Sequence, residues 1–498
     1  MSHKAIAAAA LLLSLALVFG LFAAACSDPT NNASAENGNT GDTAAAADTA
    51  ETAADETTTL FMEDSLPSLD FGGEKITHLY REAMKDEFTA DEMNGEVVND
   101  AVFAKNLAVE TRLNITIEYI PNPSMNWDGG YQSMISNSVL AGDEAYDIIS
   151  GPSFHIPTLI IEGCLYNLNE IPYLDFDKPW WTQNLAETTA FGDKLFLVSG
   201  DISMGMIRYI HCLYFNQTVT DSYGIDELYD EVFDGSWTIT RMNELCTGMY
   251  DDLNGNGSVD LNSDRFGYII TNENLWRAYI DSLDVNYLYI SPKTGLPEFN
   301  FADPRSFEVC DFFTELLSAG NPDTRMGEGN ESTYKIFTEN RAAFVLGRFI
   351  DCETAYREME DDFGILPMPK WEESQDGYEV TICGSESTFG VPVNSSKIDR
   401  IGAVMEALAS ESYRTVTPAY YESALKVKYT RDNTVSQIID LIHSGAVFNP
   451  TVQMSKLLGS IDYYIIRTAR SGGSLASTFA SVESQKIAKL EEVLEKIS

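Results

Sequence analysis

Hydrophobic and polar positions alternate along the chain in two different periods from about residue 60 onward. Residues 75–80, 115–119 and 147–149 are predicted as strands, and residues 115–119 show the two-residue period typical of strands. Helical spacing between the first two of these strands places four apolar side chains on one face: Val98, Val102, Val109 and Leu113. Residues 131–140 are predicted as a further helix. Strands that alternate with helices indicate an α/β fold with mostly parallel sheets covered by helices.

The C-terminal third is predicted to be mostly helical. Three apolar stripes recur at helical spacing, formed by Ile401, Val404, Met405 and Leu408, by Ile438, Ile439 and Ile442, and by Ile487, Leu490, Leu494 and Ile497. The chain shows no internal repeat of fixed period and no long linker between residues 60 and 498. This pattern favours two lobes woven from non-contiguous segments over a string of separate domains.

The N-terminal segment has the pattern of an export signal. Residues 5–25 are apolar apart from Ser14 and Gly20, and small residues lead directly to Cys26. Such a run predicts a secretory signal peptide over residues 1–25, and the cysteine that ends it resembles a bacterial lipobox. That resemblance implies a lipidated Cys26. The alternative is an uncleaved membrane helix, because 21 apolar residues are long enough to span a bilayer.

Residues 26–60 are predicted to form a disordered tether. Between residues 27 and 59 there are seven acidic residues, no basic residue and no apolar side chain larger than Ala. A segment of this composition buries too little apolar surface to offset its ordering entropy. The tether would hold the globular body away from a membrane or cell wall.

Charge and motif content exclude several functional classes. Lys and Arg number 32 against 76 Asp and Glu, a net charge of −44, so the chain lacks the basic surface of a nucleic-acid binder or a cationic membrane helix. No Walker loop, G-x-S-x-G, G-x-G-x-x-G or H-E-x-x-H motif occurs. Carboxylates are so frequent that a glycosidase-like pair remains open. The cysteines at positions 164, 212, 246, 310, 352 and 383 include no C-x-x-C, and we expect them to be buried apolar residues whose pairing the sequence leaves open.

One loop has the residue pattern of a calcium site. Residues 252–260 match the first nine positions of a calcium-binding loop, with oxygen-bearing residues at its odd positions and Gly257 at the sharp turn. Position twelve is Ser263 instead of the usual Glu, and Asp264 follows it. The expected ligands of a structural calcium ion are Asp252, Asn254, Asn256, the carbonyl of Ser258, Asp260 and Asp264. The alternative is an Asn/Gly-rich turn without metal.

Short motifs spread over about 400 residues resemble those of one protein family. They are AGD at 141–143 before DII at 147–149, GDKLF at 192–196 with LYFN at 213–216, SWT at 236–238, RAAF at 341–344 with Gly347, FGILPMPK at 363–370, and RTA at 467–469 after aromatic residues. In number and order they resemble bacterial extracellular solute-binding proteins of the sugar-binding type, the lipoprotein receptors of ABC importers.

The resemblance implies a two-lobed periplasmic-binding-protein fold of type II that closes on a ligand between its lobes. Lobe one would hold residues 61–200 and 370–430, and lobe two residues 201–369 and 431–498. It further implies a monomeric, non-enzymatic receptor, lipid-anchored on the extracellular face of the membrane, which passes a carbohydrate to ABC-transporter permease subunits. We expect a neutral oligosaccharide, because so acidic a protein repels anions. An exported glycan hydrolase and a surface glycan adhesin are the alternatives.

Residues expected to line the ligand cleft follow from motif positions and from the chemistry of sugars. Sugars bind through aromatic platforms and through hydrogen bonds to charged or amide side chains. The candidates are Tyr80, Arg81, Ser150, Phe154, Tyr209, Glu273, Trp276, Phe349 and Tyr463, each with the alternative of an ordinary core or surface residue. Trp237 is assigned to packing, and Trp180 and Trp181 are left open between a cleft rim and a core pair.

Overall fold

The computed structural model divides the chain into two units, residues 1–57 and 58–498. It describes residues 62–123, 129–426 and 433–497, all of which belong to the second unit. The predicted signal peptide, Cys26 and the tether lie outside the described residues. Within the described ranges, no helix has the length and apolar character needed to cross a membrane.

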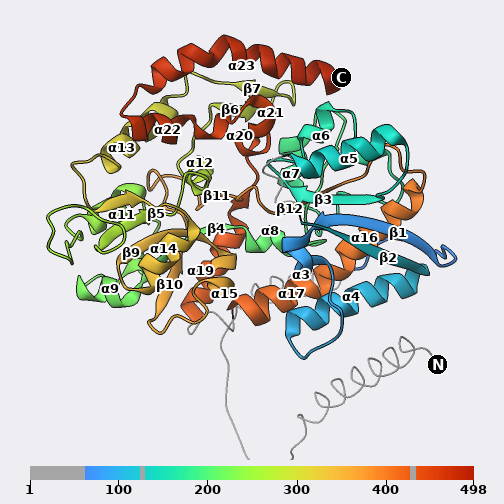
Figure 1. Ribbon diagram of the computed structural model, residues 1–498, viewed down its shortest axis with the longest axis horizontal. Coiled ribbons are helices and arrows are strands. Elements are labelled where there is room, and N and C mark those ends of the chain that lie inside the picture. Colours follow the sequence, from blue (N-terminus) through green and yellow to red (C-terminus); the bar gives the residue numbers. More distant parts are fainter. Residues whose placement is uncertain (1–61, 124–128, 427–432, 498) are drawn as a thin grey trace, which may run out of the picture. The chain divides into compact units, whose positions relative to one another are not determined.

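The first half of the second unit is built on a four-stranded sheet with the order β12-β3-β1-β2. Its strands are β1 (Glu74–Arg81), β2 (Ile115–Asn122), β3 (Ile148–Pro152) and β12 (Ser387–Gly390). β1 pairs in parallel with β2 and β3, whereas β12 runs antiparallel to β3. Helices α4 (Val97–Leu113), α5 (Gly130–Ala141) and α16 (Ile398–Arg414) lie beside this sheet (Figure 1).

Local sequence explains where α4 and β2 begin and end. The carboxylate of Glu96 accepts hydrogen bonds from the backbone N–H groups of Val98 and Asn99, which caps the first turn of α4. Asn114 then takes a left-handed conformation (φ 50°) and ends the helix. The four predicted apolar residues of α4 are all buried, and in β2 the buried Ile115 and Ile117 alternate with exposed neighbours.

The second half is built on a five-stranded sheet with the order β10-β4-β9-β5-β8. Its strands are β4 (His211–Asn216), β5 (Phe266–Ile270), β8 (Thr324–Met326), β9 (Ala342–Arg348) and β10 (Phe363–Leu366). β5 pairs in parallel with β8 and β9, but β4 runs antiparallel to both β9 and β10. The prediction of mostly parallel sheets therefore describes the first sheet, whereas the second is evenly mixed, with two parallel and two antiparallel strand pairs.

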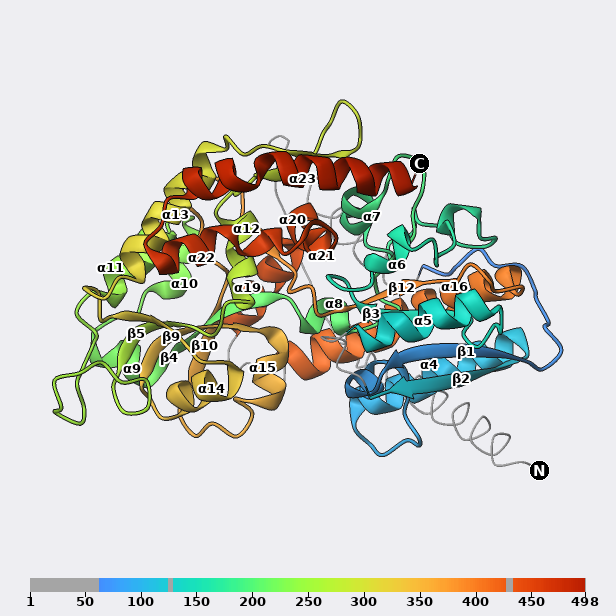
Figure 2. The ribbon, with the colours of Figure 1, turned by 45° about the horizontal axis from the view of Figure 1, so that its top comes forward.

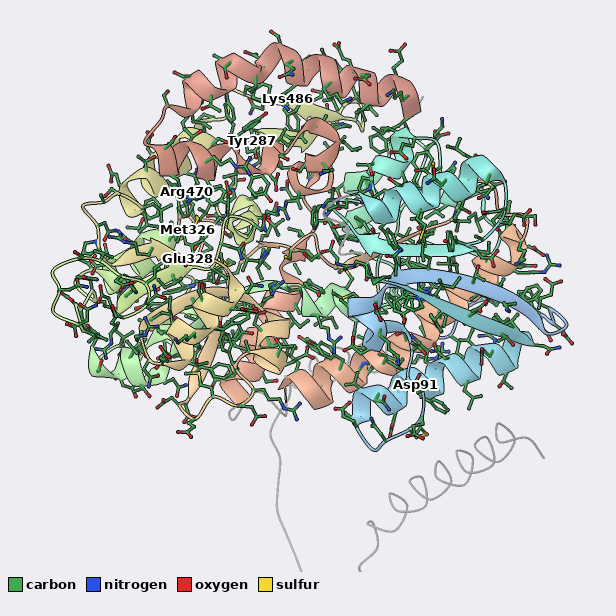
Figure 3. The ribbon with its side chains drawn as sticks, viewed as in Figure 1. Asp91, Tyr287, Met326, Glu328, Arg470 and Lys486 are labelled. Carbon is green, nitrogen blue, oxygen red and sulfur yellow. The ribbon has the colours of Figure 1, made fainter. Side chains whose placement is uncertain are left out.

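Helices of the second half pack on this sheet and on each other. They are α9 (Gln217–Ser222), α10 (Leu228–Phe233), α11 (Ile239–Cys246), α13 (Pro304–Leu316), α14 (Asn330–Thr338), α15 (Phe349–Thr354), α19 (Asn433–Ser444), α22 (Tyr464–Ser471) and α23 (Leu475–Ile497). The long α23 is held by Lys486, which donates to the Leu458 carbonyl at 2.6 Å, and by Phe479, whose ring lies 5.5 Å from that of Tyr287 (Figure 3). Of the stripe predicted on this helix, Leu490 and Ile497 are buried but Ile487 is 40% exposed.

Short elements complete the chain (Figure 2). Most are single turns: η1 (Glu82–Met84), α3 (Lys85–Phe88), α6 (Thr158–Ile161), η2 (Leu168–Glu170), α7 (Gln183–Thr189), α8 (Gly205–Arg208), η3 (Leu275–Ala278), α12 (Tyr279–Ser282), α17 (Val416–Pro418), the π-helix η4 (Ala419–Lys426), α20 (Pro450–Gln453), α21 (Ser455–Leu458) and η5 (Ile461–Tyr463). β6 (Leu288–Ile290) and β7 (Pro297–Phe299) form a small hairpin.

Residues 380–386, here called the crossing segment, lead from the second half back to the first. The segment begins with β11 (Val380–Thr381), which pairs in parallel with β13 (Ala446–Val447). The Cys383 N–H then donates to the carbonyl of Tyr209 at 3.1 Å, just before β4. Two links between the halves therefore lie side by side, which makes this junction the place where the halves can influence each other.

The predictions made for the tryptophans and cysteines can be compared with the burial and contacts of these residues in the structure. Trp237 is fully buried and donates its indole N–H to the Pro367 carbonyl at 3.0 Å, as expected of a packing residue. Trp180 and Trp181 are a core pair, and both donate to the carboxylate of Glu406. All six cysteines of the described ranges are buried and none of them forms a disulfide, as expected of small apolar residues.

Candidate ligand-binding site

Two strands of the first sheet end against the crossing segment. β1 ends at Arg81, whose Nη2 donates to the Ser385 carbonyl at 2.5 Å. β3 ends at Pro152, and two residues later the Phe154 N–H donates to the Gly384 carbonyl at 3.3 Å. The carboxyl ends of these parallel strands thus place Arg81 and Phe154 at the sheet edge where open α/β sheets bind ligands.

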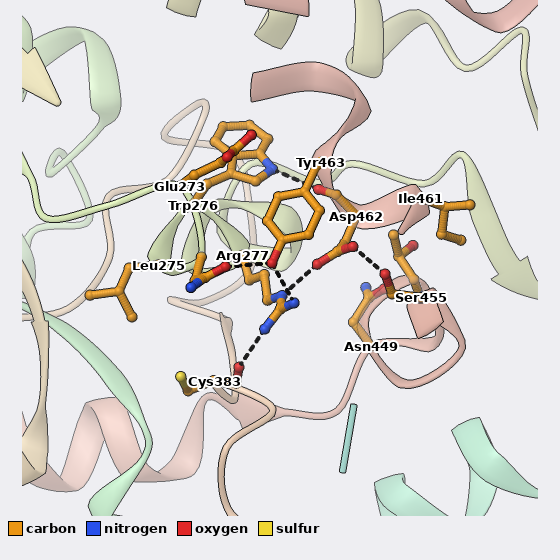
Figure 4. A network of polar contacts seen from close by, with 12 residues as sticks. Glu273, Leu275, Trp276, Arg277, Cys383, Asn449, Ser455, Ile461, Asp462 and Tyr463 are labelled. Atoms are coloured by element: carbon orange, nitrogen blue, oxygen red, sulfur yellow. Dashed lines mark hydrogen bonds and ion pairs between the residues drawn. The ribbon is translucent and has the colours of Figure 1, made fainter. Parts of the chain in front are cut away.

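A buried arginine from the second half meets the same segment (Figure 4). Arg277, on η3, forms an ion pair with the carboxylate of Asp462 at 2.5 Å and donates to the Tyr463 hydroxyl at 2.9 Å and the Cys383 carbonyl at 3.4 Å. Its guanidinium lies 4.7 Å from the centre of the Phe154 ring, which belongs to the first half. Burial alone would lower the pKa of Arg277, but Asp462 and Tyr463 raise it above its usual value. Arg277 is therefore a fixed positive charge at the junction.

Tyr463 connects this buried ion pair to a more exposed group of side chains, here called the rim, which consists of Glu273, Asn274 and Arg467. Its hydroxyl donates to the Asn274 side-chain oxygen at 2.5 Å, and the guanidinium of Arg467 lies 4.3 Å from its ring centre. Arg467 in turn forms an ion pair with Glu273 at 2.5 Å. Burial raises the pKa of Tyr463 to about 12, so the hydroxyl remains a hydrogen-bond donor at neutral pH.

A polar cavity of about 450 Å³ lies next to Phe154. It is lined by His155, whose ring centre is 4.3 Å from that of Phe154, and by residues of α5, α6 and α21. Lys456 on α21 contributes from the second half, so the cavity includes side chains from both halves. The side-chain oxygen of Gln132, which also lines it, accepts no hydrogen bond from any described residue although Gln132 is only 6% exposed. A volume of this size suits a small polar ligand.

The predicted calcium loop is folded back on itself by its own side chains. The Asp252 carboxylate accepts hydrogen bonds from the N–H groups of Asn256 and Gly257, at 3.2 and 2.7 Å. Asp264 is fully buried and accepts from the Asp260 N–H at 2.7 Å and the Tyr250 hydroxyl at 3.0 Å. In the described part of the chain no three His, Cys, Asp or Glu side chains gather as a metal site. A cation in this loop would therefore need the amide and carbonyl oxygens as well.

Comparison with known proteins identifies the fold. No protein-family model and no curated protein matches the sequence. Among solved structures, the galacto-N-biose/lacto-N-biose I-binding protein of an ABC transporter from Bifidobacterium longum matches with a TM-score of 0.54 at 13% identity, over 85% of this chain and 98% of that one. The chain has the fold of a two-lobed sugar-binding protein.

Two further solved structures of this fold match over similar lengths. A maltose-bound protein of T. maritima matches with a TM-score of 0.52 at 12% identity, over 85% of this chain and 99% of that one. The maltose/maltodextrin-binding domain from Bdellovibrio bacteriovorus, bound to maltotriose, gives 0.50 at 14% identity, over 85% and 98%. At such low identity the likeness concerns the fold alone, and any site has to be argued from this chain's own residues.

Within this two-lobed fold, five of the predicted ligand residues lie at the junction. Arg81, Phe154 and Tyr463 meet around the crossing segment, and Glu273 belongs to the rim beside Tyr463. Tyr209 borders the segment through its backbone, and the guanidinium of Arg348 lies 5.6 Å from its ring centre.

The other four predicted ligand residues lie in the packed interior. Tyr80 packs against Phe88 with ring centres 5.3 Å apart, and the Ser150 hydroxyl bonds to the ring of His78 at 2.8 Å. Phe349 is fully buried. Trp276 is 1% exposed and donates its indole N–H to the backbone carbonyl of Asp462 at 3.1 Å. In this arrangement Trp276 holds the Asp462 segment in place.

Several residues at the junction were not predicted from the sequence. Arg277 and Asp462 are direct neighbours of the predicted Trp276 and Tyr463, and the sequence analysis selected the aromatic member of each pair. Glu386 was also missed, although it is fully buried within the crossing segment. A signal was available for Glu386: it is the one charged residue of residues 380–390, a stretch otherwise made of small, apolar and hydroxyl side chains.

Proposed function

We propose that this chain is an extracellular receptor that captures a carbohydrate and delivers it to the permease subunits of an ABC transporter, without enzymatic activity. The fold supports this proposal, since the solved structures that resemble the chain are sugar-binding proteins. Receptors of this fold close two lobes around a ligand. The proposal concerns what is bound, and it rests on the residues at the junction.

One observation carries the proposal: hydrogen-bonding side chains and aromatic rings from both halves converge on the crossing segment. Arg81 and Phe154 come from the first half, and Arg277, Asp462 and Tyr463 from the second. Such a mixture of aromatic faces and charged hydrogen-bonding groups suits the CH faces and hydroxyl groups of sugars. The cavity beside His155 and Lys456 begins one residue after Phe154 and has side chains of both halves in its lining.

Calorimetry against a panel of ligands tests the proposal. The panel contains maltotriose, lacto-N-biose, glucosamine, glucuronic acid and a tripeptide. We expect micromolar or tighter binding of a neutral oligosaccharide, with the sugar recovered intact after long incubation. Heat from the tripeptide alone would overturn the carbohydrate assignment, and sugar fragments in the incubated sample would instead identify a hydrolase.

We also propose that the receptor is anchored through Cys26. The support is the apolar run that ends at this cysteine and the acidic tether that follows it. Replacement of Cys26 by Ala should release the protein from the membrane fraction and abolish acylation. A variant that remains as firmly bound and equally acylated contradicts the anchor.

A structural calcium ion in the loop around Asp252 is a further proposal. Its support is the set of hard oxygen donors on Asp252, Asn254, Asn256, Asp260 and Asp264 with the Ser258 carbonyl, and the sharp turns at Gly255 and Gly257, whose φ angles are 69° and 73°. These residues would hold the ion and fasten a surface loop of the second half. Charge supports the proposal too, because a divalent cation would offset the three carboxylates.

A thermal melt in calcium and in chelator tests this site. With a dissociation constant near ~10⁻⁴ M, millimolar calcium should add about 1–2 kcal/mol to the free energy of unfolding. Asp252→Ala and Asp260→Ala should abolish the effect, whereas Asp311→Ala, an exposed carboxylate on α13, should leave it intact. Equal melting temperatures of the wild type in both conditions would mean that the loop is an Asn/Gly turn.

A further inference from the structure

We propose that Glu386, Ser153 and Arg81 form the ligand-contacting pole of the first half, and that they select neutral ligands carrying two adjacent hydroxyl groups. This inference deepens the proposed function and rests on it. It starts from polar groups that are buried at the junction without hydrogen-bond partners.

Glu386 and Ser153 face the same place because of strand register. β12 pairs antiparallel with β3 so that Ser387 lies opposite Pro152. One step further along the pair, Glu386 lies opposite Ser153, at the carboxyl edge of β3 and inside the crossing segment. Both residues are 0–1% exposed. They are therefore neighbours at the edge where Arg81 and Phe154 also end.

No hydrogen bond of normal geometry from a described residue reaches the Glu386 carboxyl group, although the Ser153 hydroxyl and the backbone N–H groups of Gly384 and Glu386 lie near it. Neither of its oxygens accepts a hydrogen bond of normal geometry from any residue that the structure describes, and the hydroxyl of Ser153 has no partner there either. Glu406, another buried carboxylate of the first half, is different, because Trp180 and Trp181 donate to its two oxygens at 3.2 and 2.9 Å. Buried carboxylates are normally satisfied in this second way.

An unsatisfied buried carboxyl group destabilises the folded protein, so its presence calls for another role. Burial raises the pKa of Glu386 to about 7, although the nearby Ser153 hydroxyl and backbone N–H groups oppose this effect. A ligand that donates hydrogen bonds to both oxygens would remove the penalty. Polar groups left unsatisfied in a folded protein are often groups kept for binding.

Arg81 supplies hydrogen-bond donors that complement the acceptor oxygens of Glu386. Its Nη2 is bonded to the Ser385 carbonyl, next to Glu386, and its Nε has no acceptor among the described residues although Arg81 is only 9% exposed. A hydroxyl group both donates and accepts, so two adjacent hydroxyls can donate to Glu386 and accept from Arg81 and Ser153. Because the opposite charges of Glu386 and Arg81 offset each other, a ligand with a single charge gains little net attraction here, and this pole favours a neutral diol.

Paired variants separate a binding role from a structural one. Glu386→Gln keeps the shape but removes the double acceptor, and Glu406→Gln makes the same change at a satisfied carboxylate. We expect Glu386→Gln to weaken binding of the tightest neutral sugar of the panel about ten- to hundredfold, as loss of hydrogen bonds to a charged group does. It should keep or raise the melting temperature. Glu406→Gln should lower the melting temperature and leave affinity within about threefold of wild type.

Deoxy analogues of the tightest sugar add a direct test of the contact. Removal of a hydroxyl that Glu386 binds should weaken binding to the wild type but have little further effect on Glu386→Gln, so the two changes should be strongly non-additive. Additive losses for every monodeoxy analogue would overturn the contact. Ser153→Ala should show the same non-additivity more weakly.

The outcomes distinguish this inference from the proposed function. If the wild type binds only the tripeptide, the carbohydrate function and the neutral-diol preference are both wrong. If it binds only glucuronic acid, the carbohydrate function stands and the neutral-diol preference is wrong. In either case a loss of that binding in Glu386→Gln would still identify the contacting pole. If nothing in the panel binds, the melting temperatures decide. A Glu386→Gln variant as destabilised as Glu406→Gln means that Glu386 is satisfied and structural, and the inference fails.

Discussion

Two arginine clusters occupy the junction of the two halves, and they differ in where the ion-pair partners of the arginine come from. In the Arg208 cluster, Arg208 forms ion pairs with Asp86 of the first half at 2.7 Å and with Glu353 of the second half at 3.0 Å, and Tyr420 also donates to Glu353. In the Arg277 cluster, the ion-pair partner, Asp462, comes from the same half as the arginine. Across the junction Arg277 meets only an aromatic ring and a backbone carbonyl.

The difference separates a structural contact from a site that can exchange partners. Burial alone would lower the pKa of Arg208, but Glu353 and Asp86 raise it well above its usual value, so its charge is satisfied inside the protein. The contact of Arg277 with Phe154 is weaker and uses an aromatic face that a sugar can also occupy. We therefore assign the Arg208 cluster to holding the halves together and the Arg277 cluster to the ligand.

The largest expected effect comes from removal of a buried partner in the Arg208 cluster. Glu353→Gln leaves the guanidinium of Arg208, whose side chain is 9% exposed, with one exposed carboxylate as partner. Loss of one partner of a buried ion pair destabilises by about 3–5 kcal/mol, and urea unfolding should show a loss of this size. Affinity for the bound sugar should change little.

Asp86→Asn is the matched control within the same cluster. The side chain of Asp86 is 65% exposed, so its ion pair with Arg208 is well solvated and should contribute less than about 1 kcal/mol. Equal destabilisation by the two variants would contradict the assignment of Glu353 as the main partner. A large change in sugar affinity for Glu353→Gln would contradict the separation of the two clusters.

The helices and strands could be predicted from the sequence better than the ligand-binding site could. The reason is that the buried positions of a helix or strand recur at a regular spacing. Val98 and Val102 of α4 and Ile115 and Ile117 of β2 recur at the spacing of their element, so burial could be predicted from local pattern. The predicted stripe on α23 was partly wrong at Ile487, because the solvent-facing side of a long terminal helix also carries apolar residues.

The site depends on contacts that no local pattern encodes. Arg277 and Asp462 lie on the short turns η3 and η5, 185 residues apart, and Glu386 lies on the irregular crossing segment. Trp276 was selected because aromatic rings bind sugars, but a large ring is also the side chain that gains most from burial. At Trp276 the ring packs in the interior and the charged neighbour, Arg277, reaches the junction. Tyr463 and its charged neighbour Asp462, in contrast, both contact Arg277 there.

Titration of Glu386 gives a further test of the role assigned to this buried carboxyl group. The folded protein holds a proton on Glu386 up to a pH of about 7, whereas an unfolded glutamate loses it near a pH of about 4.3. The carboxyl group therefore lowers the stability of the wild type as the pH rises between these values. The stability advantage of Glu386→Gln should be small near about pH 4.5 and largest above about pH 7.5.

Urea unfolding of the wild type and Glu386→Gln across this pH range measures the difference. The limiting advantage corresponds to about 4 kcal/mol at ~1.4 kcal/mol for each tenfold change in the proton equilibrium. A difference between the wild type and Glu386→Gln that stays constant with pH would mean that the folded and unfolded proteins titrate Glu386 alike.

The smallest effect is expected at Tyr463, the link between Arg277 and the rim. Tyr463→Phe keeps the ring beneath Arg467 but removes the hydroxyl that accepts from Arg277 and donates to Asn274. Binding of the sugar should weaken by about 0.5–1.5 kcal/mol, the usual contribution of one hydrogen bond, with a smaller change in melting temperature. Tyr289→Phe, on the β6–β7 hairpin, removes a comparable hydroxyl that donates to Glu298 at 3.2 Å and should leave affinity unchanged. If both variants bind like the wild type, the Tyr463 hydroxyl only braces Arg277, and recognition at this cluster depends on the guanidinium and the aromatic rings.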